Sequence, residues 1–188
     1  MLIFYVVFVL LLTQRLLELR VAKRNQAWLE KRGGIEIGAG HYPLMVLLHA
    51  GFFISLWIEA AWRGYPLSAG WPLIGAVLLI VQIIRYWAIV SLGPYWNTRI
   101  IFVPGADVVQ RGPYRFLRHP NYTVVVLEIA LFPLLFQAYS TCVLFSLLNA
   151  FMLRHRIRVE ERGLAEYTDY TATMGRVSRF IPKVPEEK

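Results

Sequence analysis

The segment GPYRFLRHPNY, residues 112–122, concentrates polar chemistry immediately before an apolar run. Pro120 fits the first turn of a helix, where its missing N–H costs nothing, so we expect a helix to begin there. A helix start carries partial positive charge and free N–H groups. Arg115, Arg118 and His119 lie around the same place, and these side chains suit a bound carboxylate or phosphate group. The alternative is that Arg115 and Arg118 bind anionic lipid headgroups.

A second polar cluster, RIRVEERGL, follows the last apolar run. Its Arg156 and Glu160 are four residues apart, so they share one face of a helix. Such a pair is either an exposed ion pair worth about 0.3–0.5 kcal/mol, or part of a site in which the carboxylate holds a cationic ligand group. Arginine before glutamate is the weaker order for a surface ion pair, so both interpretations stay open.

Several polar residues fall inside apolar segments, where charge is costly and usually faces a bundle interior or a cavity. Arg85 lies near the inner end of its segment, and we expect its guanidinium to extend to the interface. Glu128 lies at a similar depth on the same side, and we expect it to face a cavity that receives the substrate. Asn149 needs a hydrogen-bonding partner. His49 is interpreted as a core hydrogen-bonding residue.

These residues must be positioned by a strongly apolar chain, in which 57% of 188 residues are hydrophobic. A membrane span needs roughly 20 mostly apolar residues. The sequence therefore predicts an all-α, polytopic integral membrane protein with about five transmembrane helices. The expected spans are residues 2–19, 42–62, 71–92, 122–136 and 139–153. The last two are short and close together, which predicts a helical hairpin.

Segments outside the spans also carry predictions. The first span lacks a preceding basic stretch and a following small-residue cleavage site, so we expect it to be retained rather than removed as a signal peptide. The polar loop 93–118 contains Gly-Pro and Pro-Gly turn signals, and residues 99–103 are expected to be extended along the membrane face. A weakly helical segment after the last span is expected to end at Gly175.

The net charge of +8 is unevenly distributed. Lys and Arg cluster after the first, third and fifth expected spans, whereas the opposite loops contain Arg63 and little else. The positive-inside rule then predicts a multi-pass protein of the cell membrane, with its N-terminus outside and its C-terminus in the cytosol. Tyr95 and Trp96 are expected at the membrane interface. This distribution favours membrane lipid over nucleic acid as the partner of the basic residues.

Metal and disulfide chemistry find no support in the sequence. Cys142 is the one cysteine, so no disulfide framework or cysteine-based metal site forms within one chain. The four His residues lack the spacing of a helical zinc motif. No glycine-rich phosphate-binding loop follows a strand. We therefore expect no metal.

The two polar clusters together carry a specific resemblance. GPYRFLRHPNY, a short helical hairpin and RIRVEERGLAEYTDY resemble, in this order and spacing, the isoprenylcysteine carboxyl methyltransferase family, whose pattern includes GxYxxxRHPxY and RxxxEExxL. The resemblance covers about residues 72–182 and implies an integral-membrane methyltransferase that uses S-adenosylmethionine. It implies a single domain, residues 1–188, with N-terminal spans in residues 1–70 and the catalytic core in residues 71–188. The cytosolic loop and the C-terminal segment would form the cofactor pocket.

The resemblance also implies roles for individual residues. Arg156 and Glu160 would be the catalytic pair, with Arg156 facing the substrate and Glu160 contacting the cofactor. From its depth in the membrane, Glu128 is expected to join the substrate site. Ala106 departs from the family, which has a His at that position. The residues implied to bind the cofactor are Tyr114, His119, Pro120, Asn121, Tyr122, Glu160, Val108, Val109 and Arg99.

The chain looks like the bacterial branch of the family, which includes enzymes that resemble O-methyltransferases of lipidic polyketides such as alkylpyrones. This favours a lipophilic acceptor, prenylcysteine-like or alkylpyrone-like, that enters from the bilayer and is methylated on a carboxylate or an enolic hydroxyl. Two alternatives remain. An NADPH-dependent membrane sterol-type reductase shares RHPxY but usually has more spans, and a non-enzymatic scaffold would use the basic loops to bind anionic lipid. No oligomeric state follows from the sequence.

Overall fold

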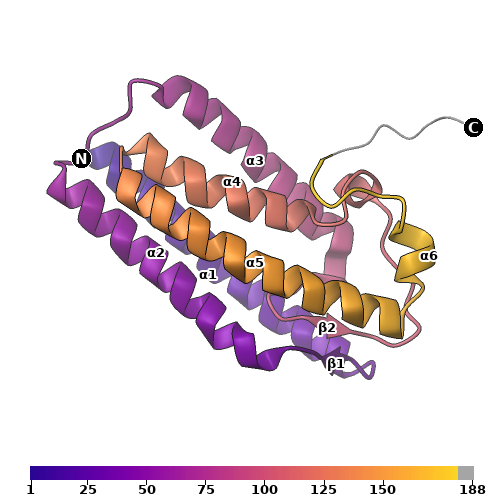
Figure 1. The fold of residues 1–188 in the computed structure, drawn as a ribbon. Helices are drawn as coiled ribbons and strands as arrows, with labels where there is room; N and C mark the ends of the chain where they lie inside the picture. The colour runs from indigo at the N-terminus through magenta and orange to yellow at the C-terminus, as the bar shows by residue number, and fades with distance from the viewer. Residues whose placement is uncertain (182–188) are drawn as a thin grey trace, which may run out of the picture.

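The computed structural model describes residues 1–181, and residues 182–188, which the predicted single domain includes, lie outside the described part. Long helices run side by side, and most of the irregular segments and one short helix gather at one end of them (Figure 1). We call this the loop end; it contains residues 31–41, 93–119 and 168–181. The opposite end carries the connections 63–70 and 136–138. The predicted all-α class is confirmed.

Three helices are long and apolar enough to cross a membrane, namely α1 (Leu2–Glu30), α2 (Tyr42–Trp62) and α3 (Trp71–Leu92). The apolar helix α4 (Pro120–Leu135) is shorter. Proline occupies the first turn of α2, α3 and α4, where its missing N–H loses no helical hydrogen bond. The predicted membrane-protein class is confirmed, and the count of five spans stays a prediction.

The predicted helical hairpin is formed by α4 and α5 (Tyr139–Tyr167). Its turn passes through Gln137, whose φ of 55° lies in the left-handed region. Glu59 of α2 holds the start of α5, because its carboxylate accepts backbone hydrogen bonds from Ser140 at 3.0 Å and Thr141 at 2.7 Å. A carboxylate at a helix start satisfies free N–H groups and complements the helix dipole. α2 and α5 are therefore fastened together at the end away from the loops.

The segment after residue 153, predicted only as weakly helical, is the second half of α5. The helix has 29 residues, which corresponds to a length of about 44 Å. This exceeds the roughly 30 Å of a hydrocarbon core, so α5 extends into the loop end. No proline interrupts it, and its single glycine is Gly163. The short helix α6 (Tyr170–Met174) follows and ends at Gly175 as predicted, but residues 168–169 interrupt the single helical segment that was expected to run there.

A small antiparallel ladder lies at the loop end, where β1 (Ile35–Glu36) pairs with β2 (Ile101–Phe102). Of the segment predicted to be extended, residues 99–103, only residues 101–102 form a strand, and its course along the membrane face stays a prediction; β1 was not predicted. The Phe102 ring packs against α5 at Gly163, where an added Cβ would lie 2.2 Å from the ring. The absence of a side chain at Gly163 therefore lets the loop after α3 reach α5.

A network of charged residues crosses the middle of the bundle. Arg85 of α3 makes a two-point ion pair with Glu18 of α1, with both N–O distances at 2.5 Å, and reaches Glu128 of α4 at 3.0 Å. Arg15 of α1 contacts the same two carboxylates at 2.8 and 2.5 Å. Gln82 of α3 donates a hydrogen bond to Glu128 at 2.8 Å. Two guanidinium groups and two carboxylates thus balance one another.

This network overturns the expectation for Arg85 and changes the surroundings expected for Glu128. Arg85 does not extend to the interface, because it is 4% exposed and engaged inside the bundle. Glu128 was expected to face a cavity, yet it is buried and paired with both arginines. Hydrocarbon cannot hydrate either charge, so each residue takes its counter-charge from a neighbouring helix.

Replacing Arg85 tests the network. Arg85→Met leaves two buried carboxylates against one guanidinium, and removing one partner of a buried pair costs about 3–5 kcal/mol. We expect a large drop in the thermal unfolding temperature of the detergent-purified protein. Adding Glu18→Gln restores the charge balance and should recover part of the loss. Arg63→Met, at an ion pair whose arginine is partly exposed, is the matched control and should cost much less; equal losses at the two positions would contradict this role.

Candidate functional site

A cavity of about 570 Å³ opens at the loop end and continues into the bundle. At the loop end it is enclosed by residues 95–109, by η3 (Gly112–Arg115) and α6, by the start of α4 and by the second half of α5. We call this part the polar chamber. Deeper, the cavity is lined by apolar side chains of α1 and α2, and we call this part the apolar arm. One cavity thus joins a polar site to a hydrophobic one.

The start of α4 forms one wall of the polar chamber. His119 precedes the helix and Pro120 begins it, and Asn121 and Tyr122 line the cavity. The Tyr122 hydroxyl donates a hydrogen bond to the Glu160 carboxylate on α5. The rings of His119 and Tyr122 stack with their centroids 5.3 Å apart. The predicted helix start therefore places the HPNY residues beside the second polar cluster.

Tyr114 reaches the polar chamber on η3. This segment can approach α3 because Gly112, with a φ of 60°, has no side chain; an added Cβ would lie 1.9 Å from the Ser91 hydroxyl oxygen. The Tyr114 hydroxyl is buried and has no hydrogen-bond partner within residues 1–181. Burial, together with the nearby Glu160 carboxylate, raises the pKa of Tyr114 well above its usual value. The hydroxyl therefore stays protonated and can donate to a ligand.

Arg156 is a buried charge on the wall of the polar chamber. It is 4% exposed, and its Nη2 donates to the Thr98 carbonyl at 2.9 Å. Its Nε and Nη1 are buried and find no partner in the part of the chain that the structure describes. A buried guanidinium with unfilled donors is costly alone, whereas two N–H groups can bind an anion together. Glu160 lines the cavity one turn further along α5, so α5 presents both charges to one space.

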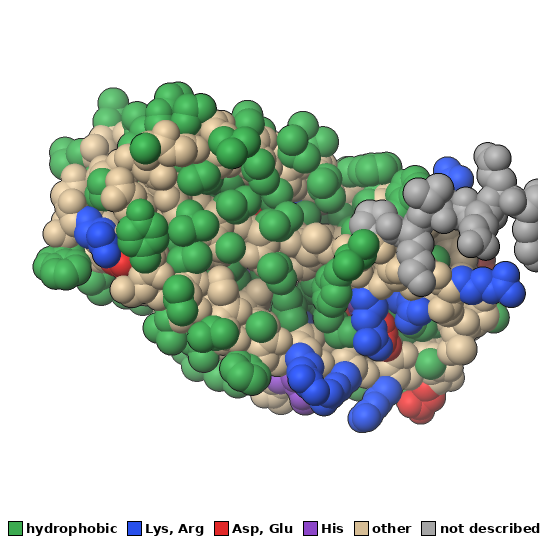
Figure 2. Space-filling model, turned by 45° about the horizontal axis from the view of Figure 1, so that its top comes forward, with side chains coloured by type: hydrophobic (Ala, Val, Ile, Leu, Met, Phe, Trp, Pro, Cys, Tyr) green, Lys and Arg blue, Asp and Glu red, His purple; other side chains and the backbone are tan. Residues whose placement is uncertain are grey.

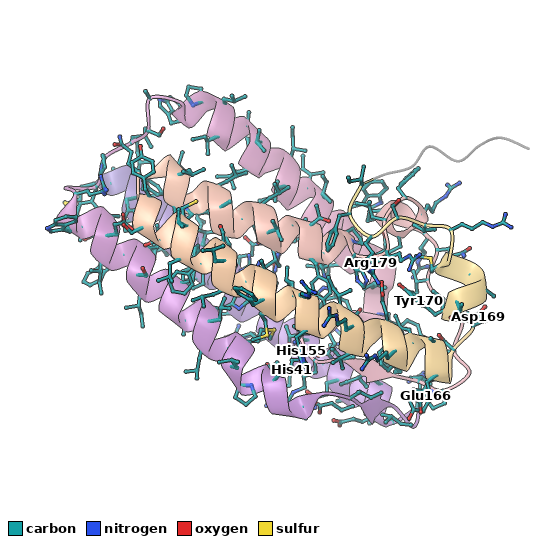
Figure 3. The ribbon with its side chains drawn as sticks, viewed as in Figure 1. His41, His155, Glu166, Asp169, Tyr170 and Arg179 are labelled. Carbon is teal, nitrogen blue, oxygen red and sulfur yellow. The ribbon has the colours of Figure 1, made fainter. Side chains whose placement is uncertain are left out.

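Glu161 fastens the C-terminal segment behind the chamber wall. His119 Nε2 donates to its carboxylate at 3.1 Å, and Arg179 donates to it at 2.9 and 2.5 Å. Arg118 donates to two carbonyls of the same segment, at 2.5 and 2.7 Å. Arg179 and Tyr170 both lie at this end of the molecule (Figure 3). Burial opposes ionisation of Glu161, but the hydrogen bonds from His119 and Arg179 outweigh it and lower its pKa to about 2.

The apolar arm is open on its membrane side. α1 contributes Leu12, Leu16 and Leu19 to its lining, and α2 contributes Val46 and Phe53. Leu16 and Val46 keep 60% and 45% of their surface accessible, so the arm is not sealed between α1 and α2. Hydrophobic side chains also cover the flank of the bundle shown in Figure 2.

Both polar clusters fall within a region that matches a known family. Residues 73–166 match the model of the isoprenylcysteine carboxyl methyltransferase (ICMT) family. The chain belongs to this family. The match extends from α3 through most of α5, and the resemblance predicted from the two clusters is confirmed. Membership of this family indicates a membrane methyltransferase, which the match favours over the reductase and scaffold alternatives.

The chain is also similar to two bacterial proteins. The chain is 48% identical to the protein YpbQ of Bacillus subtilis over 165 residues. This alignment covers 88% of the present chain and 98% of YpbQ. The chain is 24% identical over 166 residues to an uncharacterized protein of Haemophilus influenzae, with coverages of 88% and 96%. Its fold is similar to that of the eukaryotic intramembrane Ras methyltransferase ICMT, with a TM-score of 0.59 and 19% identity over 79% of this chain. The match covers 55% of that chain, so the present chain spans about half its length.

Most of the predicted site residues of this methyltransferase line the same cavity. They are Tyr114, His119, Asn121, Tyr122, Glu160, Arg156, Val108, Val109 and Arg99. Pro120 and Glu128 are not on the cavity wall. The Arg99 guanidinium is already paired with Glu36 at 2.7 Å and lies 4.1 Å from the centre of the Tyr42 ring. Arg99 therefore joins the loop after α3 to β1 and to the start of α2. The ligand contacts of these residues stay predictions.

Sequence reasoning missed several residues of the cavity wall. Trp96 was expected at the membrane interface, but it is buried, and its indole N–H has no partner among the described residues. A Gly-Pro pair shortly before Trp96 is a turn signal that could have indicated the return of the chain over the bundle. Tyr170 and Met174 enter the wall from α6, and His49 and Asn149 enter it from α2 and α5. Their positions depend on helix rotation, which the sequence does not specify.

Acidification tests the contacts of Glu161. Its folded pKa of about 2 lies below the ordinary value of 4.5, so its contribution to stability is present above pH 4.5 and is lost as the pH falls from there towards 2. We expect Glu161→Gln to lower the thermal unfolding temperature at pH 7 by about 2–8 °C. The difference from the wild type should shrink as the pH is lowered from 6 to 3.

The exposed Glu166, on the same helix (Figure 3), provides a matched control. Glu166→Gln should leave the unfolding temperature close to that of the wild type at every pH. A Glu161→Gln difference that stays constant with pH, or that is absent at pH 7, would contradict the proposed anchoring of the C-terminal segment.

Proposed function

We propose that this protein transfers a methyl group from S-adenosylmethionine to an acidic oxygen of a lipophilic acceptor. The oxygen belongs to a carboxylate or an enolic hydroxyl, on a prenylcysteine-like or alkylpyrone-like molecule. The supporting observation is the buried Arg156, which has two unfilled N–H donors and lines a cavity with a polar chamber and an open apolar arm. An amphiphilic anion would satisfy both the guanidinium and the arm.

The polar chamber has the hydrogen-bonding groups that S-adenosylmethionine needs. The hydroxyls of Tyr114 and Tyr170, Oδ1 of Asn121 and Nε1 of Trp96 are buried and unpaired among the described residues. A polar ligand would satisfy them. The Glu160 carboxylate suits an ammonium group, and the N–H groups at the start of α4 suit a carboxylate. When bound, the cofactor supplies the electrophilic methyl group.

Other predicted residues shape the chamber. Val108 and Val109 line it and offer apolar contacts to a flat ring. His119 is held by Glu161 at 3.1 Å and so keeps the start of α4 in place. Pro120 sets the direction of that helix. These three elements would orient the cofactor without taking part in bond making.

In-line methyl transfer depends on positioning more than on acid–base catalysis. An ionised carboxylate or enolate is already nucleophilic, so no side chain has to remove its proton. Arg156 would hold this anion through Nε and Nη1 while Nη2 stays on the Thr98 carbonyl. Glu160 lies four residues further along α5, about 6 Å along the axis. The two residues would therefore hold acceptor and cofactor next to each other.

We propose that the loop end faces the cytosol. In Figure 2 most of the Lys and Arg side chains gather there, whereas hydrophobic side chains cover the rest of the visible face. By the positive-inside rule such an end is cytosolic, and α1 then begins on the outer side. The polar cofactor would enter at the loop end, and the lipophilic acceptor would enter between α1 and α2.

Equilibrium binding to the detergent-purified protein tests the cofactor. We expect saturable, micromolar binding of S-adenosylmethionine to the wild type. Glu160→Gln should weaken it about 10- to 100-fold, because a hydrogen bond to a charged group contributes about 1.5–3 kcal/mol. Saturable binding of NADPH without binding of S-adenosylmethionine would instead favour the reductase, and binding of neither would favour the scaffold.

Replacing Arg156 separates cofactor binding from methyl transfer. Arg156→Leu should keep most of its affinity for S-adenosylmethionine and lose methyl transfer by at least about 100-fold, the usual effect of removing a group that orients or stabilises the reacting oxygen. The measurement is the incorporation of labelled methyl groups into a lipid extract of cell membranes. Arg158→Leu, at an exposed position of α5, should retain both properties. Full activity of Arg156→Leu would exclude the assigned role.

A further inference from the structure

We infer that the apolar arm contains a second polar subsite, formed by His49 of α2 and Asn149 of α5. This subsite selects acceptors that carry a hydroxyl or amide group at a distance from the methylated oxygen. The inference rests on the proposed function, but it concerns which acceptor is chosen rather than whether methyl transfer occurs.

Asn149 is a buried polar residue that faces the cavity. It is 2% exposed and lines the cavity wall, and its carboxamide makes no hydrogen bond with any side chain or backbone group in residues 1–181. A carboxamide offers two N–H donors and an oxygen acceptor. Leaving them unfilled among apolar side chains is costly, so Asn149 is suited to a polar group of a ligand.

His49 offers a defined hydrogen-bonding atom to the same arm. Its Nδ1 lies 2.9 Å from the Met45 carbonyl oxygen. A carbonyl oxygen only accepts hydrogen bonds, so Nδ1 carries the proton and Nε2 of the neutral ring is an acceptor. Nε2 has no partner in the described chain, and His49 lines the cavity. The ring therefore offers an acceptor to a ligand hydroxyl or amide N–H.

The packing of α2 against α5 places His49 and Asn149 at nearly the same height along the helix axes. At the loop end the rings of His41 and His155 contact each other, with centroids 5.1 Å apart (Figure 3). Towards the other end the hydroxyls of Ser55 and Thr141 are 2.8 Å apart. The two helices are thus antiparallel, and interpolation between these contacts places position 49 of α2 opposite position 147 of α5.

This register fixes the place of the subsite. Asn149 is two residues from the position opposite His49, so the two residues differ by about 3 Å along the helix axes. Arg156 is seven residues from Asn149, on the same face of α5 and about 10 Å along the axis. The Arg156 side chain leans towards the helix N-terminus, in the direction of the subsite. The second polar group of the acceptor therefore lies within about 10 Å of the oxygen held by Arg156.

The charged residues that line the cavity nearby are not free to bind a polar group of the acceptor. Arg15, Glu18 and Arg85 also line the cavity, but they are engaged with one another and with Glu128. His49 and Asn149 are the polar side chains of the arm left for a ligand among the described residues. Because His49 accepts while Asn149 both donates and accepts, a hydroxyl or amide fits them, and an unsubstituted hydrocarbon chain leaves both unsatisfied.

Two matched probes test the subsite, namely hexadecanoate and hexadecanoate with a hydroxyl at mid-chain. Their affinities are measured on the full, detergent-purified chain with S-adenosylmethionine present. We expect the wild type to bind the hydroxylated probe about threefold to tenfold more tightly, the usual net effect of a hydrogen bond. Asn149→Leu and His49→Phe should each remove most of this preference. Leu148→Ala, at an exposed position of α5, is the matched control and should keep it.

Binding of S-adenosylmethionine is measured for every variant, so that a fault in folding or in the cofactor site is seen separately. If the wild type binds the cofactor but shows no preference between the probes, or binds neither probe, the subsite is wrong and the proposed function stands. Survival of the preference in both variants also overturns the subsite. If the wild type binds no S-adenosylmethionine, the proposed function itself fails.

Discussion

Charge pairing between α1, α3 and α4 is the interaction on which the rest of the structure depends. In a bilayer, apolar helix surfaces have little reason to associate, because lipid tails are as apolar as leucine. Arg15, Glu18, Arg85 and Glu128 supply that reason, since separating the helices would leave bare charges in hydrocarbon. The network holds α1 where it walls the apolar arm and α4 where its first turn meets the polar chamber. The site therefore depends on residues that are engaged with one another inside the bundle.

The second constraint is the anchoring of α5 by a carboxylate near each end. Glu59 binds the free N–H groups at its start, and Glu161, near its other end, binds the chain that follows α6. Between them, one uninterrupted helix carries Asn149, Arg156 and Glu160. Their separations are set by helical geometry and not by loop conformation.

The chemistry of this protein was more accessible from sequence than the packing that creates its site. Arg156 and Glu160 could be predicted to share a face because helical spacing is local, and Pro120 marked the start of α4. The partners of Arg85 and Glu128 could not be predicted, because a buried charge reveals its counter-charge only when the rotations of several helices are known. Trp96 was misplaced for a related reason, since an aromatic residue near a span end looks the same at an interface and inside a folded-back loop.

The family match begins at residue 73, within α3, whereas the apolar arm is walled largely by α1 and α2. The stretch that matches the family and the helices that wall most of the arm are therefore largely separate in the sequence. Mutations in the first two helices can reshape the hydrophobic wall without touching the groups proposed to hold the cofactor. Under the proposed function, changes in α1 and α2 would alter which hydrophobic molecules fit the arm while leaving the cofactor site as it is.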